Sequence, residues 1–312
     1  MTATTLALAE TLTERPRQGR PPRRVRRTLM AWSFALPFVV LFLVFGAGPV
    51  LASLAFSFSD LRARDVRSPF SVNFVGLENY IDIFSDATFV RAIGNTIYFV
   101  VIGIPLTMAL GLLVAVGLNA GINKLKGVFR VSYFAPFVTS IIAVAVVWRY
   151  LYQEDGLLNA LLGVVGIPGP DWLNDPAWAM PALIIMAVWR NIGLPMVIFL
   201  AGLQNIPKEL YEAGEVDGAR GFTAFRTITL PLLRPTTLVV AVLLSIGYLQ
   251  FFEEPFVMTN GGPLDATVSI GLYAYEQFGF GNYGVASAAS YVLVIFIVAL
   301  GLLQFRLFRS RT

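Results

Sequence analysis

Six long apolar stretches constrain the fold of this 312-residue chain more than any other feature of its sequence. A helix that crosses the hydrocarbon core of a membrane needs about 20 mainly apolar residues, and each stretch is at least that long. We therefore expect an all-α integral membrane protein, a six-helix transmembrane bundle. The predicted spans are residues 31–58, 94–118, 130–151, 180–203, 236–258 and 284–308.

The composition agrees with a membrane environment and excludes several kinds of chemistry. Hydrophobic residues make up 56% of the chain and charged residues only 13%, whereas soluble domains carry about 25% charged residues. The chain has no cysteine and no histidine. Disulfides, thiolate nucleophiles, histidine acid–base catalysis and soft-metal sites are thereby excluded. We expect no catalytic residue and no metal site.

The amino-terminal region carries a concentrated positive charge. Seven arginines lie between Arg15 and Arg27, without an acidic residue among them. Such a run can bind nucleic acid, but directly before a long apolar segment it is more typical of a terminus held in the cytoplasm. A secretory signal has an apolar core of only about 7–15 residues, shorter than the run from Ala31 to Phe58. We expect a disordered basic tail over residues 1–28, a transmembrane domain over 29–312, and no nucleic-acid partner.

The other basic residues orient the predicted bundle. Seventeen lysines and arginines lie on the side of the amino-terminal tail, and four lie on the opposite side, all in the connection 59–93. Because cytoplasmic loops carry the excess of basic residues, both termini are predicted to be cytoplasmic. The connections 59–93, 152–179 and 259–283 then face outward. Arg149 lies near the outer end of its span, where its side chain can reach the interface, so it needs no functional explanation.

The cytoplasmic connection 204–235 has the pattern of two short helices. Pro207 suits the first turn of a helix, and Gly218 is a typical stop. A second helix with Phe222 and Ile228 follows. The pattern predicts a helix–turn–helix displayed to the cytoplasm, with a surface-lying amphipathic hairpin that has no partner as the alternative.

This connection resembles a known family signature. Its order is Glu212-Ala213-Gly214, three residues, Gly218, nine residues, Ile228, one residue and Leu230-Pro231. It is similar, without gaps, to the EAA signature of ABC importer permeases, with Gly214 where the family usually has alanine. The resemblance implies a type I ABC importer permease fold whose cytoplasmic coupling helix docks on a separate ATPase. The residues implied in coupling are Glu212, Ala213, Gly214, Asp217, Gly218, Ile228, Leu230 and Pro231.

Four further motifs resemble carbohydrate-uptake permeases, specifically the first permease of glycerol-phosphate and maltose-like systems. They are Phe74–Tyr80, Asp155–Asn159, Ile206–Tyr211 and Thr259–Pro263. The resemblance implies a multi-pass protein of the bacterial plasma (inner) membrane. It also implies three partners: a second homologous permease, an ABC ATPase dimer and an extracytoplasmic sugar-binding protein. The chain lacks a G-x-x-x-x-G-K-[ST] loop, so ATP and Mg would be bound by the ATPase, and this chain would be neither an enzyme nor a cofactor carrier.

A substrate pathway is implied in the fourth and fifth spans. The candidate residues combine polar groups for sugar hydroxyls with aromatic faces, although aromatic residues at helical spacing are often simple packing. A charge inside a span is costly, so Arg190 is expected either to face an aqueous pathway or to pair with Glu253 or Glu254. The candidates are Arg190, Gly193, Met196, Tyr248, Gln250, Phe251 and Glu253.

Two other functions compete with the sugar permease. A secondary transporter predicts inverted repeats and broken helices, and no convincing repeat relates residues 29–151 to 180–308. An ABC permease for a non-sugar solute is compatible with the EAA signature alone. The outward-facing motifs favour the sugar.

Overall fold

The computed structural model describes residues 23–68, 72–121 and 126–308. Most of the predicted basic tail, residues 1–22, lies outside this part of the chain. Within the described ranges the chain is helical, and its β pairing is limited to one isolated bridge between Ser59 and Phe74. The predicted all-α class is confirmed.

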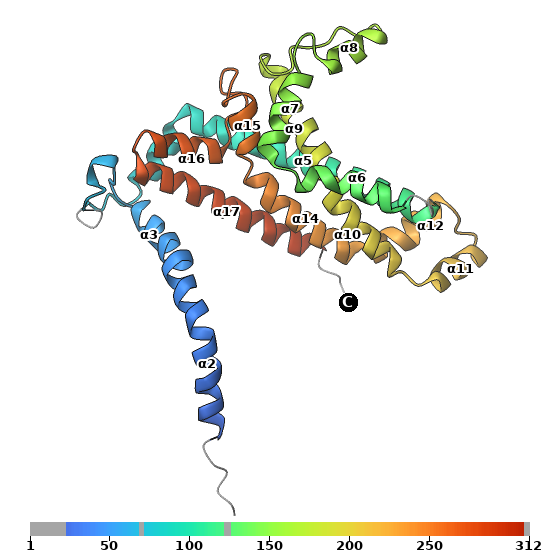
Figure 1. Cartoon of the computed structure of the whole chain (residues 1–312), viewed down its shortest axis with the longest axis horizontal. Helices are drawn as coiled ribbons and strands as arrows, with labels where there is room; N and C mark the ends of the chain where they lie inside the picture. Colours follow the sequence, from blue (N-terminus) through green and yellow to red (C-terminus); the bar gives the residue numbers. More distant parts are fainter. Residues whose placement is uncertain (1–22, 69–71, 122–125, 309–312) are drawn as a thin grey trace, which may run out of the picture. The chain divides into compact units, whose positions relative to one another are not determined.

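The first apolar stretch forms most of a separate compact unit that ends at Ala52. Helix α2 (Arg23–Phe42) runs through a π-helical turn (Leu43–Ala47) into α3 (Gly48–Phe56) (Figure 1). The helix begins within the predicted tail, whose last residues are therefore helical. Its segment Trp32–Phe56 is long and apolar enough to cross a membrane. Exposed apolar side chains such as Phe34 suit a helix surrounded by lipid.

The second unit, residues 53–312, is organised around the long helix α5 (Ala87–Ala120). Helices α9 (Pro176–Asn191), α10 (Gly193–Gln204) and α14 (Arg234–Leu249) pack against α5. Their shared core contains Phe99, Leu183 and Met196, each at most 1% exposed. Because α5 is covered on several sides, it can hold residues of the other helices in fixed positions.

A smaller core lies beside the first one. It joins α4 (Glu78–Ser85), the start of α5, α16 (Ile270–Gly279) and α17 (Tyr283–Phe308). Ala288 and Ala289 of α17 are fully buried in it. Small residues let helices approach closely in lipid, so the small-residue start of the last span serves packing within the chain.

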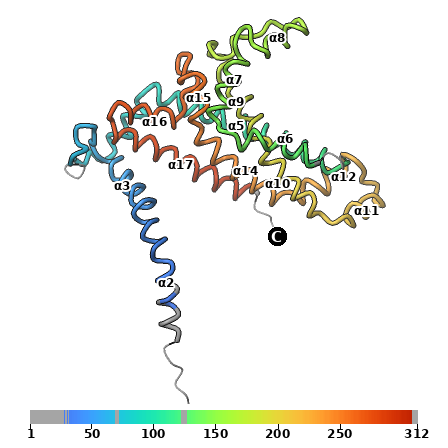
Figure 2. Tube along the Cα trace, in the orientation of Figure 1, coloured from blue at the N-terminus to red at the C-terminus, as the bar shows by residue number. Residues whose placement is uncertain are grey.

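Three of the six predicted spans are broken helices rather than continuous ones. Stretch 130–151 forms α6 (Lys126–Val138) and α7 (Ile141–Leu151), which meet at 97° (Figure 2). Ser140 between them is extended, and Pro136 removes a backbone donor shortly before the bend. Stretch 180–203 is bent by 44° between α9 and α10.

The fifth predicted span ends earlier than residue 258. Helix α14 stops at Leu249, and α15 (Glu253–Met258) is a separate short helix. At its other end α14 meets the helical stretch Phe222–Leu232 at 68°. The described chain thus has three continuous candidate spans, or six if each bent pair counts as one.

Candidate functional site

A cavity of about 330 Å³ lies where several of these helices meet. Four of the predicted pathway residues line it, namely Arg190, Tyr248, Phe251 and Glu253. Other lining residues that the sequence did not single out include Phe99 of α5, Phe137 of α6 and Asn191 at the end of α9. After α14 ends at Leu249, the chain contributes Phe251, Glu253 and Glu254 to the lining.

Three predicted pathway residues are not among those that line this cavity. Gly193 faces α6, where an added Cβ would collide with the carbonyl oxygen of Tyr133 and lie 2.8 Å from the Cα of Phe134. Met196 is fully buried in the core, and Gln250 is exposed just after α14. The glycine is therefore explained by close helix packing rather than by contact with a substrate.

Arg190 supports the bend between α6 and α7. Its Nη2 donates to the carbonyl oxygens of Phe137 and Thr139, both at 3.4 Å, and its guanidinium carbon lies 6.0 Å from the centre of the Phe137 ring. The ion pairs within 4.0 Å found in the described ranges do not include one from Arg190 to Glu253 or Glu254. Arg190 thus lines the cavity without the hypothesised pairing.

Two polar atoms of the cavity residues are buried and unsatisfied. Glu254 is only 6% exposed, and its Oε2 has no hydrogen-bond partner among the described residues. The Nε of Arg190 is also buried and unpartnered within the same ranges. Buried donors and acceptors normally have partners, so these two atoms mark Arg190 and Glu254 as unusual polar residues beside the cavity. From the sequence, Glu254 is predicted only as a possible ion-pair partner of Arg190.

An aromatic wall closes one side of the cavity. The rings of Phe99 and Phe251 stack with centroids 4.0 Å apart and an interplanar angle of 10°. Tyr248 packs on Phe99 at 5.1 Å, and its hydroxyl is hydrogen-bonded to Thr107 at 2.5 Å. Tyr248 and Phe251 are therefore largely buried by packing, and only a small part of each side chain faces the cavity.

The predicted helix–turn–helix at 204–235 is confirmed as a helical hairpin. Helix α11 (Lys208–Val216) ends at a turn in which Gly218 has a φ of +82°. The second arm, Phe222–Leu232, consists of α12 (Phe222–Ala224), a π-helical turn (Phe225–Thr229) and α13 (Leu230–Leu232). A left-handed residue at the end of a helix favours glycine, as the predicted stop requires.

The faces of the two arms that meet inside the hairpin make few contacts. Tyr211 and Thr229 share one hydrogen bond of 2.9 Å between their hydroxyls. Gly214 lies against Ile228, and an added Cβ would come 2.5 Å from the Ile228 Cδ1. Gly214 and Ile228 of the EAA-like pattern thus form an apolar contact between the two arms, beside the Tyr211–Thr229 hydrogen bond.

The outer face of the hairpin is open. Glu212, Ala213, Asp217 and Gly218 are all exposed, and an added Cβ at Gly218 would meet nothing within 4 Å. Val216 is 88% exposed. The face therefore presents small groups, the apolar Val216 and the carboxylates of Glu212 and Asp217 to its surroundings.

Comparisons with known proteins agree with this architecture. Residues 13–310 match the family described as binding-protein-dependent transport system inner membrane component. The chain is 34% identical over 286 residues to the lactose transport system permease protein of Rhizobium radiobacter, covering 90% of this chain and 94% of that one. It is also 34% identical over 289 residues to the trehalose/maltose transport system permease protein of Thermococcus litoralis, covering 92% and 96%.

A solved structure shares the fold. A chain of a bacterial alginate ABC transporter, in complex with a pentasaccharide-bound periplasmic protein, superposes with a TM-score of 0.78 at 24% identity, covering 93% of this chain and 98% of that chain. The predicted resemblance to ABC importer permeases of the carbohydrate-uptake type is confirmed. The chain belongs to the family of inner membrane components of binding-protein-dependent transport systems.

Proposed function

We propose that this chain is a permease subunit of an ATP-driven sugar importer of the bacterial plasma membrane. It forms half of the translocation pathway and carries an oligosaccharide or a similar sugar. The proposal is supported by relatives that are named for lactose, arabinooligosaccharide, and trehalose/maltose transport. The observation that carries it is the cavity lined by Arg190 and Glu254, each of which has a buried polar atom without a partner among the described residues.

The cavity has the chemistry that a sugar requires. A hydroxyl group both donates and accepts, and the lining residues Arg190 and Glu254 carry donors and acceptors respectively. Phe251 and Tyr248 add apolar surface to the lining of the same cavity. Glu253, at the same wall, adds a second carboxylate acceptor. In this proposal these five side chains form the pathway lining of this subunit.

The hairpin 204–235 is the coupling segment in the same proposal. The sequence contains no nucleotide-binding G-x-x-x-x-G-K-[ST] loop, so ATP and Mg belong to a separate ABC ATPase dimer. The exposed face around Glu212 and Gly218 docks on that dimer, and Glu212 pairs with a basic residue there. A second homologous permease and an extracytoplasmic sugar-binding protein complete the transporter.

The distribution of lysine and arginine supports one orientation of the chain in the membrane. The excess of basic residues on the side of the amino-terminal tail places both termini and the coupling segment in the cytoplasm. Closure of the ATPase dimer then moves the coupling segment as a rigid body and opens the permease pair outward.

Uptake into proteoliposomes that contain the complete transporter and its binding protein tests the proposal. Lactose, maltose, trehalose and arabinobiose serve as labelled probes, and ATP-dependent uptake of at least one is expected. Glu254→Gln and Arg190→Met should each lower uptake about tenfold, because a hydrogen bond to a charged group contributes about 1.5–3 kcal/mol. Leu303→Ala, at an exposed position of α17, is the matched control.

Two outcomes contradict the proposal. ATP-dependent uptake of amino acids but of none of the sugars would favour the non-sugar permease. Loss of the Arg190→Met protein from the membrane would show that Arg190 acts only as a support for the bend at Phe137 and Thr139.

A further inference from the structure

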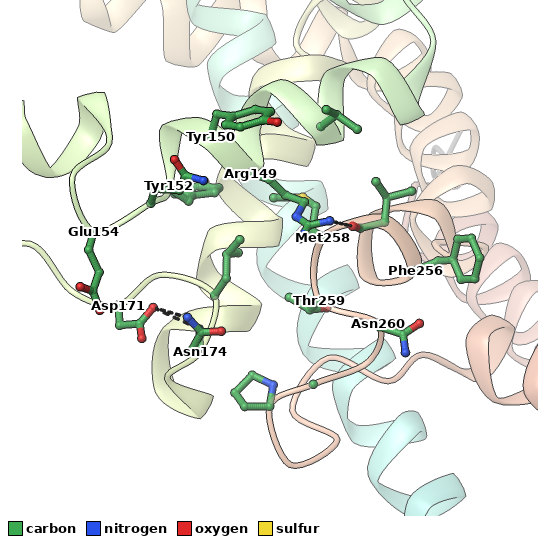
Figure 3. A pocket seen from close by; sticks show the side chains of 16 residues that line it. Arg149, Tyr150, Tyr152, Glu154, Asp171, Asn174, Phe256, Met258, Thr259 and Asn260 are labelled. Carbon is green, nitrogen blue, oxygen red and sulfur yellow. Dashed lines mark hydrogen bonds between the residues drawn. The ribbon is translucent and has the colours of Figure 1, made fainter.

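A larger pocket, of about 760 Å³, lies on the side of the chain predicted to face outward. One wall consists of the end of α7 and residues 152–154, together with residues 171–174. The opposite wall runs from Phe256 in α15 to Pro263 (Figure 3). Its volume is in the range of pockets that bind small molecules, and it is more than twice that of the inner cavity.

Asn159, at the start of helix α8 (Leu157–Val164), fixes the first wall. Its Nδ2 lies within 3.4 Å of the carbonyl oxygens of Gln153, Glu154 and Pro170, and its Oδ1 accepts a 2.7 Å hydrogen bond from the indole of Trp172. These bonds join the two segments that carry Glu154 and Asp171. Hydrogen bonds therefore fix this wall of the pocket, so the pocket is preformed.

The second wall is fixed by hydroxyl groups and by Arg149. Thr259 and Thr267 share a 2.7 Å hydrogen bond, and Thr267 donates to the carbonyl oxygen of Gly262 at 2.8 Å. Arg149, in α7, donates to the carbonyl oxygen of Val257, in α15, at 3.2 Å (Figure 3). This bond joins the two walls where α7 and α15 pack against each other.

The lining chemistry favours a neutral, hydroxyl-rich ligand. Arg149 is the cation of the lining and is outnumbered by the carboxylates of Glu154 and Asp171, so an anion is disfavoured. Asn174 and Asn260 add amides that both donate and accept. Tyr150, 65% exposed, offers an aromatic face. Hydroxyl groups need this mixture of donors and acceptors, and sugar rings need the aromatic face.

Helix α15 links this pocket to the inner cavity. Glu253 and Glu254, in its first turn, line the inner cavity, and Phe256, Val257 and Met258 line the outer pocket. Six helical residues span only about 9 Å. We propose that the outer pocket is a second carbohydrate-binding site, which holds the sugar before it enters the inner cavity. The proposal rests on the proposed sugar-import function and extends it.

Site-specific labelling tests the outer pocket, because the chain has no natural cysteine. Asn174→Cys and Gln153→Cys, made separately in the complete transporter, place a thiol at exposed positions of the pocket. Ala160→Cys, exposed on α8 and not a pocket residue, is the control. The rate of labelling by a water-soluble maleimide is measured on this chain with and without lactose, maltose, trehalose or arabinobiose.

We expect at least one sugar to slow labelling at the pocket positions about threefold when present at twice its Kd, and to leave Ala160→Cys unaffected. Adding Arg149→Gln should abolish this protection. Equal labelling rates with and without every sugar, at both pocket positions, would overturn the proposal. If such equal rates accompany normal sugar uptake, the outer site fails and the proposed function stands; absence of uptake would refute the function separately.

Discussion

The connections predicted to face outward and the hairpin 204–235 both lie at the surface, but they differ in how many hydrogen bonds fix their backbone. In and beside the connections, asparagine side chains donate hydrogen bonds to backbone carbonyl oxygens. Asn79 donates to Ser57 and Ser59, and Asn95 donates to Asp265 and Val268, all at 2.8–2.9 Å. Between its two arms the coupling segment has the Tyr211–Thr229 hydrogen bond and the contact of Gly214 with Ile228.

The difference suggests that the connections are built to keep a fixed conformation and that the hairpin is built to expose residues to a partner. The connections keep their conformation because their carbonyl groups are satisfied from within the chain, as a pocket with fixed walls requires. The hairpin 204–235 keeps small residues such as Ala213 and Gly218 exposed, which leaves room for the close approach of the partner that we propose. Substitutions in the connections should therefore change stability first, and substitutions in the coupling segment should change transport first.

The largest effect on stability is expected at Asn159. Asn159→Ala removes its hydrogen bonds and leaves carbonyl groups of the loop unsatisfied, which should cost about 2–3 kcal/mol. A lower Tm of the purified protein, by roughly 5 °C, measures this loss. Asn174→Ala is the matched control, because Asn174 is exposed and, among the described residues, its hydrogen bonds go to Asp171. Equal Tm values for the two variants would contradict the claim that Asn159 fixes the wall.

A large effect on transport with a smaller effect on stability is expected at Gly218. Gly218→Leu forces a side chain into a left-handed conformation, at a cost of about 1–2 kcal/mol, and places bulk on the exposed face. We expect sugar uptake to be lost while ATP hydrolysis continues and the protein stays in the membrane. Gly218→Asn, which tolerates this conformation, should retain most activity. Normal uptake by Gly218→Leu would count against docking at this face.

The hydroxyl pair inside the hairpin should have an intermediate effect. Tyr211→Phe removes one hydrogen bond and should lower stability by about 1 kcal/mol. Thr229→Val should do the same, and the double variant should be no worse than either single one, since both remove the same interaction. Thermal unfolding of the three variants measures the coupling. Fully additive losses would show that the two groups act independently.

The smallest effect is expected at Gly214, where the family signature has alanine. Gly214→Ala gains helix propensity of up to about 1 kcal/mol, but its Cβ displaces the terminal methyl group of Ile228. The two effects nearly cancel, so Tm should change little. In an Ile228→Val background the displaced methyl group is absent, and the same substitution should raise Tm. A fall in Tm in that background would contradict the assigned contact.

Local patterns predicted much of the fold. The apolar stretches predicted the positions of the spans, and the start and stop signals at Pro207 and Gly218 predicted the hairpin, because each depends on residues close together in the chain. Gly218 as the stop of α11 is confirmed by its positive φ. The bends were missed because membrane bundles tolerate proline within a span, so Pro136 did not by itself indicate the 97° turn.

Long-range contacts could not be predicted from the sequence. The collision at Gly193 depends on the backbone of α6, some 60 residues earlier in the chain. Glu253 and Glu254 are neighbours in sequence, yet Glu254 is buried, with an oxygen that has no partner among the described residues, and Glu253 is only half-buried. The sequence does not predict this difference, because it depends on what packs around the first turn of α15. Arg149 was interpreted as an interface residue, and its reach to Val257 appears only in the folded chain.

Docking of the hairpin 204–235 on an ABC ATPase can be detected with a photo-reactive amino acid at Val216, which is the most exposed large apolar residue of the hairpin. After irradiation in the native membrane, the tagged chain is purified and the cross-linked product is identified by mass spectrometry. We predict a cross-link to a protein that contains a G-x-x-x-x-G-K-[ST] nucleotide-binding loop. Recovery of the chain alone, or cross-linked only to lipid, would contradict the account.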